Sequence, residues 1–427
     1  MRYTSVLIIL FLLNTVKVFA QRSLDLYIEL ARQNSPLIID NQNQQKANVL
    51  EADRLKAQYM KPLISVTANY LLAPIIDRSN GQPKLVPNPS SSENYSGYDI
   101  AAANGGVYQS LATITQPLFN SSRYKAFADQ SLLAARINEN NVNVSGHDVE
   151  KLVIDQYLLC LQDMQQWQYT DTLLNLLGQQ QKIVSKLVES GLLKQSDLTL
   201  VNIEIQTQKN AKINFKTTYK RDLLDLNALC GIEDTTLAIL NNVSLEKRDS
   251  IAQSRWLVKY HLDSLTLNAQ RKVFELKYKP IVNAFANGGL NAVYAPTIPN
   301  RLGMSAGLSF NWNIFDGRQR RINQQKIKVL TQTVHTYRNY FQLQNSVRIQ
   351  RINNELSGLE QRIATIQQQL KDYNSLMTFY KKEFMQGQLS VINYINTLKN
   401  RMAVNRDYLL LQTNRQLLIN LYNYWNW

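Results

Sequence analysis

The side chains that most often carry out chemistry in proteins are few in this 427-residue sequence and lie far apart. They are the histidines His147, His261 and His335 and the cysteines Cys160 and Cys230. No two of them have the spacing of metal ligands. The sequence has no G-x-S-x-G, phosphate-binding-loop or dinucleotide motif. Carboxylates are the only candidate catalytic groups left, and all of them fit the solvated face of a helix. We therefore expect no enzyme activity, no metal and no cofactor.

The first twenty residues have the pattern of a secretory signal peptide. Arg2 gives a basic start, Val6 to Leu13 is almost wholly apolar, and Ala20 precedes the predicted cleavage at Gln21. No later stretch holds eighteen consecutive apolar residues, so the mature chain is expected to lack a transmembrane helix. No cysteine follows the cleavage point, which argues against a lipid anchor there. A membrane could then be entered only as a barrel, or be bound at its surface.

The formal net charge is +15. A basic chain can bind nucleic acid, anionic lipid or acidic cargo. Secretion and the lack of any nucleic-acid-binding motif argue against the first of these, so we expect no nucleic-acid partner.

The sequence follows one plan twice. Phe119 lies 196 positions before Phe315, and Gly191 lies 196 positions before Gly387. The matching segments are 61–64 with 279–282, 116–120 with 312–316, and 190–191 with 386–387. Between 77 and 106 the first half carries an insertion rich in Pro, Ser, Asn and Gly, the composition of an exposed loop.

Each half is predicted to contain a helix, a strand hairpin, a long helix, a turn and a returning helix. The first half is expected to span 21–240, with strands at about 63–72 and 106–118 and a helical hairpin at about 121–230. The second is expected to span 241–427, with strands at about 281–294 and 303–315 and a helical hairpin at about 318–425.

The predicted strands alternate between apolar and small polar residues. The clearest apolar set, which we predict to face a membrane, is Met304, Ala306, Leu308, Phe310, Trp312 and Ile314. Such strands of about ten residues suit a membrane barrel. An antiparallel sheet packed on a soluble core would show the same alternation, so the strands leave both structures open.

The helical segments follow a heptad pattern. From Ile349 to Phe384 the apolar residues recur at alternating steps of three and four. No proline lies between Gly317 and the C-terminus, so a helix from Arg318 to Gln386 would extend ~100 Å at about 1.5 Å per residue. Two such helices exceed a compact single domain. Four strands cannot close a barrel and open sheet edges cannot lie in lipid, so a membrane sheet would require three chains.

In their order, these features resemble the TolC-like family of outer-membrane efflux ducts over nearly all of the mature chain. The best match is 312–318, where the last strand leads into the long helix. Next are the two helix turns, Gly191 with Ser196 and Asp197, and Gly387 with Ser390. No single motif is specific for the family, but their order, found twice in the sequence, is a strong resemblance.

The resemblance implies a mainly helical α+β fold of two structural repeats, each a β-hairpin with a long coiled-coil helical hairpin. It implies a homotrimer that forms a twelve-stranded transmembrane β-barrel in the outer membrane and an α-helical tunnel through the periplasm. The implied function is the exit duct of a tripartite efflux or type I secretion system. The implied partners are outer-membrane lipid and a periplasmic adaptor, or membrane fusion protein, which joins the duct to an inner-membrane pump. The alternative is a surface or periplasmic coiled-coil protein with a structural or adhesive role and no pore.

The helix turns are the implied adaptor-docking tips, although each could be a helix turn and nothing more. The residues concerned are Gly191, Leu192, Leu193, Ser196, Asp197, Gly387, Gln388, Leu389 and Ser390. Gly191 is expected to end the outgoing helix at positive φ. Ser196 or Asp197 is expected to cap the first returning helix, and Ser390 the second.

The family's periplasmic gate maps onto Asn393, Asn396, Asp197 and Phe384. Where the family carries a ring of aspartates, this sequence has Asn393 and Asn396. Rings of asparagine lack the like-charge field of carboxylates, which predicts weaker cation selectivity and weaker block by divalent cations.

Three further features leave alternatives open. A group of basic residues flanks the strand ends and could reach lipid phosphates or begin solvated helices: Lys61, Arg123, Lys279, Arg318, Arg320 and Arg321. Cys160 and Cys230 lie about equally far from the first helix turn and could form a disulfide or remain separate buried thiols. The aromatic tail 422–427 is expected to pack on the middle of the helical tunnel.

Overall fold

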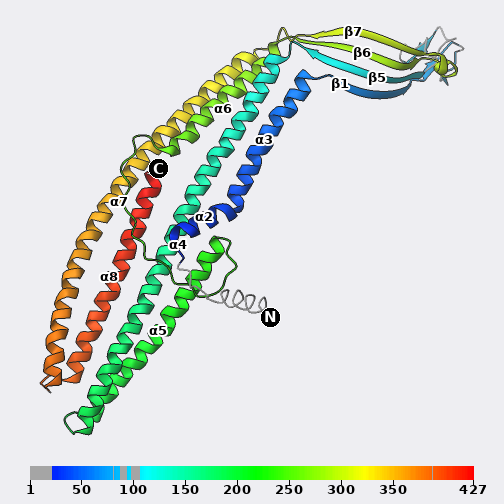
Figure 1. The fold of residues 1–427 in the computed structure, drawn as a ribbon. Coiled ribbons are helices and arrows are strands. Elements are labelled where there is room, and N and C mark those ends of the chain that lie inside the picture. Colours follow the sequence, from blue (N-terminus) through cyan, green and yellow to red (C-terminus); the bar gives the residue numbers. More distant parts are fainter. Residues whose placement is uncertain (1–21, 80, 87–93, 98–105, 387) are drawn as a thin grey trace, which may run out of the picture. The chain divides into compact units, whose positions relative to one another are not determined.

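The computed structural model describes residues 22–79, 81–86, 94–97, 106–386 and 388–427 (Figure 1). The predicted signal peptide lies outside these residues. The chain divides into two compact units. Unit 1 comprises Met1–Gln42, Asn140–Val258 and Arg338–Trp427, and unit 2 comprises Asn43–Glu139 and Lys259–Tyr337. Each unit therefore combines segments from both halves of the sequence. No helix among the described residues is both long and apolar enough to cross a membrane.

Unit 2 contains an antiparallel four-stranded sheet in the order β1-β5-β6-β7. Its strands are β1 (Leu63–Leu72), β5 (Gly106–Leu118), β6 (Ile281–Ala292) and β7 (Leu302–Asn311). A smaller sheet, ordered β3-β2-β4, is built from β2 (Ile75–Asp77), β3 (Lys84–Val86) and β4 (Tyr95–Ser96). Three short 3₁₀ turns lie in the second half of the chain, at Arg255–Leu257, Leu276–Tyr278 and Ala295–Asn300.

The helices confirm the prediction of a mainly helical fold with a duplicated plan. Helix α4 (Ser121–Glu189) has 69 residues and α7 (Gln319–Met385) has 67. Each is followed by a returning helix of 35 residues, α5 (Gln195–Leu229) or α8 (Val391–Trp425). The other helices among the described residues are α2 (Leu24–Asn34), α3 (Pro36–Met60) and α6 (Val258–Glu275).

The helical part of unit 2 has a small core. Leu133 of α4 is buried against Leu262 and Ala269 of α6. The rings of Tyr59 on α3 and Phe127 on α4 stack with centroids 5.2 Å apart. These contacts hold the helices beside the strand ends.

The main core of unit 1 centres on three fully buried tyrosines, and each hydroxyl reaches a hydrogen-bond acceptor. Tyr27 donates to Asn227 Oδ1 (3.2 Å), Tyr157 to the carbonyl of Asn241 (2.7 Å) and Tyr219 to that of Ala238 (2.5 Å). A buried hydroxyl without an acceptor destabilises the folded state, so these hydrogen bonds are needed to place tyrosines in this core.

Cys160 and Cys230 lie in the same core as free thiols, so the disulfide alternative is wrong. Burial raises the pKa of Cys230 to about 12 and that of Cys160 further, which keeps both thiols protonated.

The heptad seam predicted on the last long helix is buried. Ile352 and Leu356 pack against Ile419 and Tyr422 of α8. Further along the same seam, Leu359 and Ile363 pack against Leu411 of α8. The alternating steps of three and four therefore correspond to a helix pair, as expected.

The glycine turn that follows α5 packs against the end of α2. Gly231 follows the C-cap residue Cys230 and has φ 68°. A Cβ atom at this position would lie 2.8 Å from Cβ of Asn34, whose side-chain amide donates to the carbonyl of Cys230 (2.8 Å). Both the backbone angle and the space therefore require glycine here.

We expect Gly231→Ala to destabilise the protein by about 2 kcal/mol, because alanine is strained at positive φ and its methyl group displaces Asn34. Gly178→Ala is the matched control. Gly178 lies within α4, and a methyl group added to it would meet no neighbouring atom within 4 Å, so alanine there should stabilise the helix by about 1 kcal/mol. Denaturant midpoints followed by circular dichroism measure both changes. Equal shifts in the two variants would contradict the role given to Gly231.

Candidate functional site

The register of the four-stranded sheet gathers apolar side chains onto one face. Leu308 lies opposite Ala284, and Val66 lies opposite Ala112, and directly opposed residues share a face. We call this set the apolar sheet face: Ile64, Val66, Ala68, Tyr70, Leu72, Ala112, Ile114, Leu118, Val282, Ala284, Ala286, Leu290, Leu302, Met304, Ala306, Leu308 and Phe310. Much of it is open to solvent, since Met304 is 93% exposed and Val66 74%.

The opposite face of the sheet is mostly polar. Three side-chain hydrogen bonds cross between its strands, from Ser305 to Asn287 (2.7 Å), from Asn69 to Gln109 (3.3 Å) and from Asn283 to Ser309 (3.4 Å). Phe285 is an exception, and its ring covers the cross-strand residue Gly307, where a Cβ atom would lie 2.9 Å from the ring. One face thus suits an apolar environment and the other suits water.

Four of the six residues predicted to face a membrane lie on the apolar sheet face, and two lie beyond it. Strand β7 ends at Asn311, so placing Trp312 and Ile314 on the strand is wrong. The last pair of the ladder joins Ile281 to Asn311, and the residue before Ile281 is Pro280. Proline has no N–H to extend the ladder. The Trp312 indole N–H instead donates to the carbonyl of Tyr278 (3.0 Å).

The turn from β7 into α7 is closed by Asp316. Its carboxylate accepts hydrogen bonds from the Tyr278 hydroxyl and from the N–H of Arg320 (2.7 Å). The bond from Tyr278 is the main reason that the pKa of Asp316 lies below its usual value.

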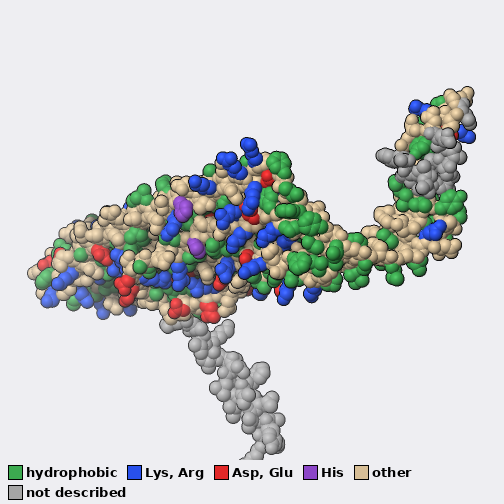
Figure 2. Space-filling view, turned by 90° about the horizontal axis from the view of Figure 1, so that it is seen from above, with side chains coloured by type: hydrophobic (Ala, Val, Ile, Leu, Met, Phe, Trp, Pro, Cys, Tyr) green, Lys and Arg blue, Asp and Glu red, His purple; other side chains and the backbone are tan. Residues whose placement is uncertain are grey.

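Two of the six basic residues at the strand ends make internal contacts. Arg123 donates to the carbonyls of Leu276 (2.8 Å) and Lys279 (2.7 Å), and Arg320 pairs with Glu275 (2.6 Å). The other four, Lys61, Lys279, Arg318 and Arg321, are exposed. Basic side chains also lie spread along the helices rather than in one patch on the face drawn in Figure 2.

The first helix turn ends α4 as predicted. Gly191 has φ 74°, and the N–H of Leu192 donates to the carbonyl of Leu187 (2.8 Å). The predicted cap of the returning helix is wrong, because α5 begins at Gln195 with Lys194 as its N-cap. The carboxylate of Asp197 reaches back to accept the N–H of Lys194 (3.0 Å), and so the helix starts before Ser196.

The second helix turn is capped by Ser390, as predicted, and its hydroxyl accepts the N–H of Asn393 (3.4 Å). Gln388 is exposed, and its N–H donates to the carbonyl of Glu383 (2.9 Å). Gly387 lies outside the described residues.

The two turns share one hydrophobic cluster, which we call the tip core. Leu193 of the first turn and Leu389 of the second pack against its buried residues. The buried residues are Leu173, Leu177, Val184, Val201, Phe384, Val391, Tyr394, Ile395 and Leu398. Leu192, in contrast, is 72% exposed. Among the predicted docking leucines, only Leu192 offers most of its side chain to a partner.

The four residues predicted to form a gate are not equivalent. Asn393 and Asn396 are exposed one turn apart on α8. Phe384 is buried in the tip core, where its ring stacks on Tyr394 with centroids 5.4 Å apart. Asp197 is engaged with the start of α5. Of these four residues, only the two asparagines are exposed.

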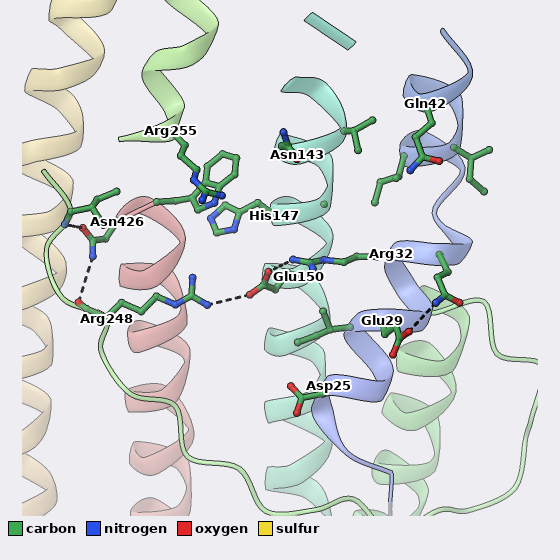
Figure 3. Close-up of a pocket in the computed structure, with 18 of the residues that line it drawn as sticks. Asp25, Glu29, Arg32, Gln42, Asn143, His147, Glu150, Arg248, Arg255 and Asn426 are labelled. Carbon is green, nitrogen blue, oxygen red and sulfur yellow. Dashed lines mark hydrogen bonds and ion pairs between the residues drawn. The ribbon is translucent and has the colours of Figure 1, made fainter. Parts of the chain in front are cut away.

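A pocket of about 1100 Å³ in unit 1 contains a network of ion-paired side chains (Figure 3). The spacing of these residues in the sequence does not reveal the network. Glu150 on α4 accepts from Arg32 on α2 (2.5 Å) and from Arg248 in the segment before α6 (3.4 Å). These partners lie 118 and 98 positions from Glu150. The pocket charges thus largely satisfy one another and tie three chain segments together.

The aromatic tail packs beside this pocket. His147 stacks against Tyr424 and Trp427, with centroids 4.9 and 4.3 Å away, and its Nε2 lies 3.0 Å from the carbonyl of Tyr424. Burial holds the pKa of His147 below its usual value. Trp425 stacks on the guanidinium of Arg348 (3.7 Å). His147 is thus a packed structural residue, and no group of three or more potential metal ligands occurs in the described part of the chain.

Solved structures of outer-membrane channels share this fold. CmeC of Campylobacter jejuni matches with a TM-score of 0.68 at 11% sequence identity, over 97% of this chain and 88% of that one. VceC of Vibrio cholerae matches with a TM-score of 0.67 at 13% identity, over 94% and 96%. The open state of MtrE from Neisseria gonorrhoeae matches with a TM-score of 0.66 at 10% identity, over 94% and 88%. No protein family and no curated protein sequence matches the chain. At these identities the likeness shows the fold: long helical hairpins joined to a four-stranded sheet.

One carboxylate pair in the helices has unusual protonation. Asp163 on α4 is 9% exposed and lies against Asp222 on α5. Burial, then the hydrogen bond and charge of Asp222, raise the pKa of Asp163 to about 7. Arg221, 2.7 Å from Asp222, partly offsets the repulsion. Below neutral pH Asp163 therefore keeps its proton.

We expect Asp163→Asn to stabilise the protein at about pH 8, by on the order of 2 kcal/mol, and to have little effect at about pH 3. In the unfolded chain Asp163 loses its proton near its ordinary pKa of about 4. The folded state keeps the proton up to about pH 7, so its stability falls as the pH rises between these values. Thermal midpoints across this range measure the effect, with Asp53→Asn, an exposed position on α3, as control. A constant difference at all pH values would contradict the raised pKa of Asp163.

Proposed function

We propose that this chain is one protomer of a trimeric outer-membrane exit duct for a tripartite efflux or type I secretion system. It would conduct substrates from a periplasmic adaptor and inner-membrane pump to the exterior. The observation that carries the proposal is the exposed apolar sheet face, found on a chain with the fold of outer-membrane channels. The mechanism is conduction and gating, without bond chemistry.

The sheet edges supply the argument for three copies. Strands β1 and β7 each lack a neighbour on their outer side among the described residues. Unpaired N–H and C=O groups are not tolerated in hydrocarbon, so a membrane sheet must close. Pairing β7 of one copy with β1 of the next would join twelve strands from three copies. The polar face, with its cross-strand hydrogen bonds, would then line a wet interior.

Exposed aromatic and basic residues at the strand ends support insertion into lipid. Phe119 is 89% exposed, Phe315 86% and Trp312 52%. Lys61 and Lys279 each lie two residues before a strand, β1 or β6, and are exposed. Aromatic rings and snorkelling basic chains are typical of the boundary between hydrocarbon and headgroups.

Helix α7 carries a second apolar seam that its own chain leaves open. Its members recur at helical spacing and are 56% to 66% exposed: Ile322 61%, Val329 66%, Tyr340 56%, Leu343 63% and Val347 59%. A seam of this period is typical of packing against another helix. A second copy of the chain would cover it, which supports a trimeric tunnel.

The alternative, a coiled-coil structural or adhesive protein without a pore, requires the apolar sheet face to be buried in a soluble core. Most of its side chains are instead exposed, and none is buried, in the part of the chain that the structure describes. The duct is therefore the better supported function.

The helix turns are the proposed contact with the periplasmic adaptor. Gly191 and Leu192 on the first turn, and Gln388 on the second, are exposed above the tip core. Leu192 is the proposed anchor, because an exposed leucine on a turn is best accommodated by a partner. Asn393 and Asn396, just beyond the second turn, are the proposed gate surface.

Leu308→Arg should sharply reduce the amount of assembled protein in the outer membrane. An arginine in the hydrocarbon region costs about 2–4 kcal/mol per copy near the midplane of the bilayer, and a trimer carries three. Ser309→Arg, on the polar face of the same strand, is the matched control and should assemble. Membrane fractionation with trimer detection on unheated gels measures both. Equal loss in the two variants would argue against a lipid-facing role for Leu308.

The double substitution of Asn393→Asp and Asn396→Asp should increase cation selectivity and divalent-cation block, because three copies would form rings of carboxylates. Reversal potentials of the purified protein in planar bilayers measure this change. Asn43→Asp, on an element that contributes no residue to the turns, controls for added charge. Absence of any conductance in the unaltered protein would contradict the duct itself, whereas conductance with unchanged selectivity would remove only the gate assignment.

A further inference from the structure

Unit 1 contains a partly open cavity of about 240 Å³ between α4, α5 and α8. Its apolar wall includes Leu173, Phe215, Met402 and Leu409. Its polar lining includes Gln166, Tyr169 and Glu204. None of these residues belongs to the ion network of Figure 3, whose charges already pair with one another.

The cavity contains a buried carboxylate with spare acceptor capacity. Glu204 is 4% exposed, and its Oε1 accepts from the side chain of Gln208 (2.8 Å). Its Oε2 lies 3.7 Å from Nζ of Lys399, beyond hydrogen-bond distance. No other hydrogen bond to Oε2 occurs among the residues that the structure describes. A buried carboxylate normally accepts more than one short hydrogen bond, so Oε2 is available to a donor.

One further polar group of the same cavity has no partner. The Tyr169 hydroxyl is buried and has no hydrogen-bond partner in the described structure. The side chain of Gln166, which is 9% exposed, also lines the cavity. Buried polar groups are almost always paired, so unpaired groups around one cavity indicate a missing ligand or solvent.

The distribution of charge indicates the sign of the ligand. The negative charge of Glu204 is at the buried side, whereas the side chain of Lys399 is 55% exposed and Arg406 is exposed as well. The two cations can therefore stay hydrated, while the carboxylate cannot. An ammonium group has three donors and no acceptor, which matches Glu204 Oε2, the Gln166 carbonyl and the Tyr169 hydroxyl.

The size of the cavity limits the apolar part of the ligand. A dry cavity of about 150 Å³ is large enough to bind benzene. The present volume, about 240 Å³, therefore has room for one aromatic ring with a short aminoalkyl chain. A zwitterion or a polycation would place further charge against the apolar wall.

We propose that this cavity binds a small organic cation, an alkylammonium group attached to one apolar ring. The ammonium bonds to Glu204, with Gln166 and Tyr169 as further acceptors, and the ring packs between Leu173, Phe215 and Met402. The bound cation contacts both helical hairpins, since α4 and α5 form the first and α8 belongs to the second. The inference rests on the packing within unit 1 and does not require the proposed duct function.

The test measures binding of 2-phenylethylammonium to the purified full-length protein by isothermal titration calorimetry. We expect saturable binding and a rise in the thermal midpoint, because a ligand that binds only the folded state stabilises it. Glu204→Gln should weaken binding by about tenfold or more through loss of a charge-assisted hydrogen bond. Glu139→Gln removes the same charge from an exposed position on α4 and should leave binding unchanged.

Ala211→Leu, which adds bulk to the cavity lining, should abolish binding while the far-ultraviolet circular dichroism remains that of the folded protein. The neutral probe 2-phenylethanol and the anion phenylacetate should bind at least about tenfold more weakly than the ammonium, because neither matches the carboxylate. Lack of binding by the ammonium, equal affinity in Glu204→Gln, or tighter binding of phenylacetate would each overturn the proposal.

Discussion

The backbone hydrogen bonds of β1 and β7 are satisfied on one side only, within the part of the chain that the structure describes. An open edge is tolerated in water but not in hydrocarbon, and the apolar sheet face is unsuited to water. These two requirements conflict in a single chain, because the apolar side chains favour lipid while the open edges exclude it. Closure with further copies, as proposed above, would resolve the conflict. The outer seam of α7 leads to the same conclusion from the helical side.

Within each unit, buried polar groups restrict how the helices pack. The hydroxyls of Tyr27, Tyr157 and Tyr219 all reach acceptors in the main core of unit 1. Glu150 joins Arg32 to Arg248 at the pocket beside His147. Such contacts favour one arrangement over others, since a shifted helix would leave several groups unpaired. The cavity at Glu204 differs from these places, because the Tyr169 hydroxyl there has no partner among the described residues.

The helix turns combine a rigid interior with a small exposed surface. The tip core holds both turns through Phe384, Leu193 and Leu389, and Leu192 remains outside it. A docking surface on such a turn would be preorganised, which limits the entropy lost on binding. Asn393 and Asn396 lie on the helix that starts at the second turn, so any movement of that turn would also move them.

Periodicity and residue type were sufficient to predict the long helices and the four strands of the larger sheet, but not the small sheet of β2, β3 and β4. Alternation of period two located β1, β5, β6 and β7, and steps of three and four located the seam from Ile352 to Ile363. Gly191 and Ser390 marked two helix boundaries, because each acts through neighbouring backbone groups. The sequence was less informative where a partner decides the outcome. Strand β7 stops at Asn311 because Pro280 ends the strand beside it, and α5 starts before Ser196 because Asp197 reaches back to Lys194. Tertiary structure alone decided three features: the two cysteines as unpaired thiols, the network at Glu150 and the cavity at Glu204. Local patterns follow from the geometry of a single element, whereas these contacts join residues far apart in the chain, and only the packing of the helices brings them together.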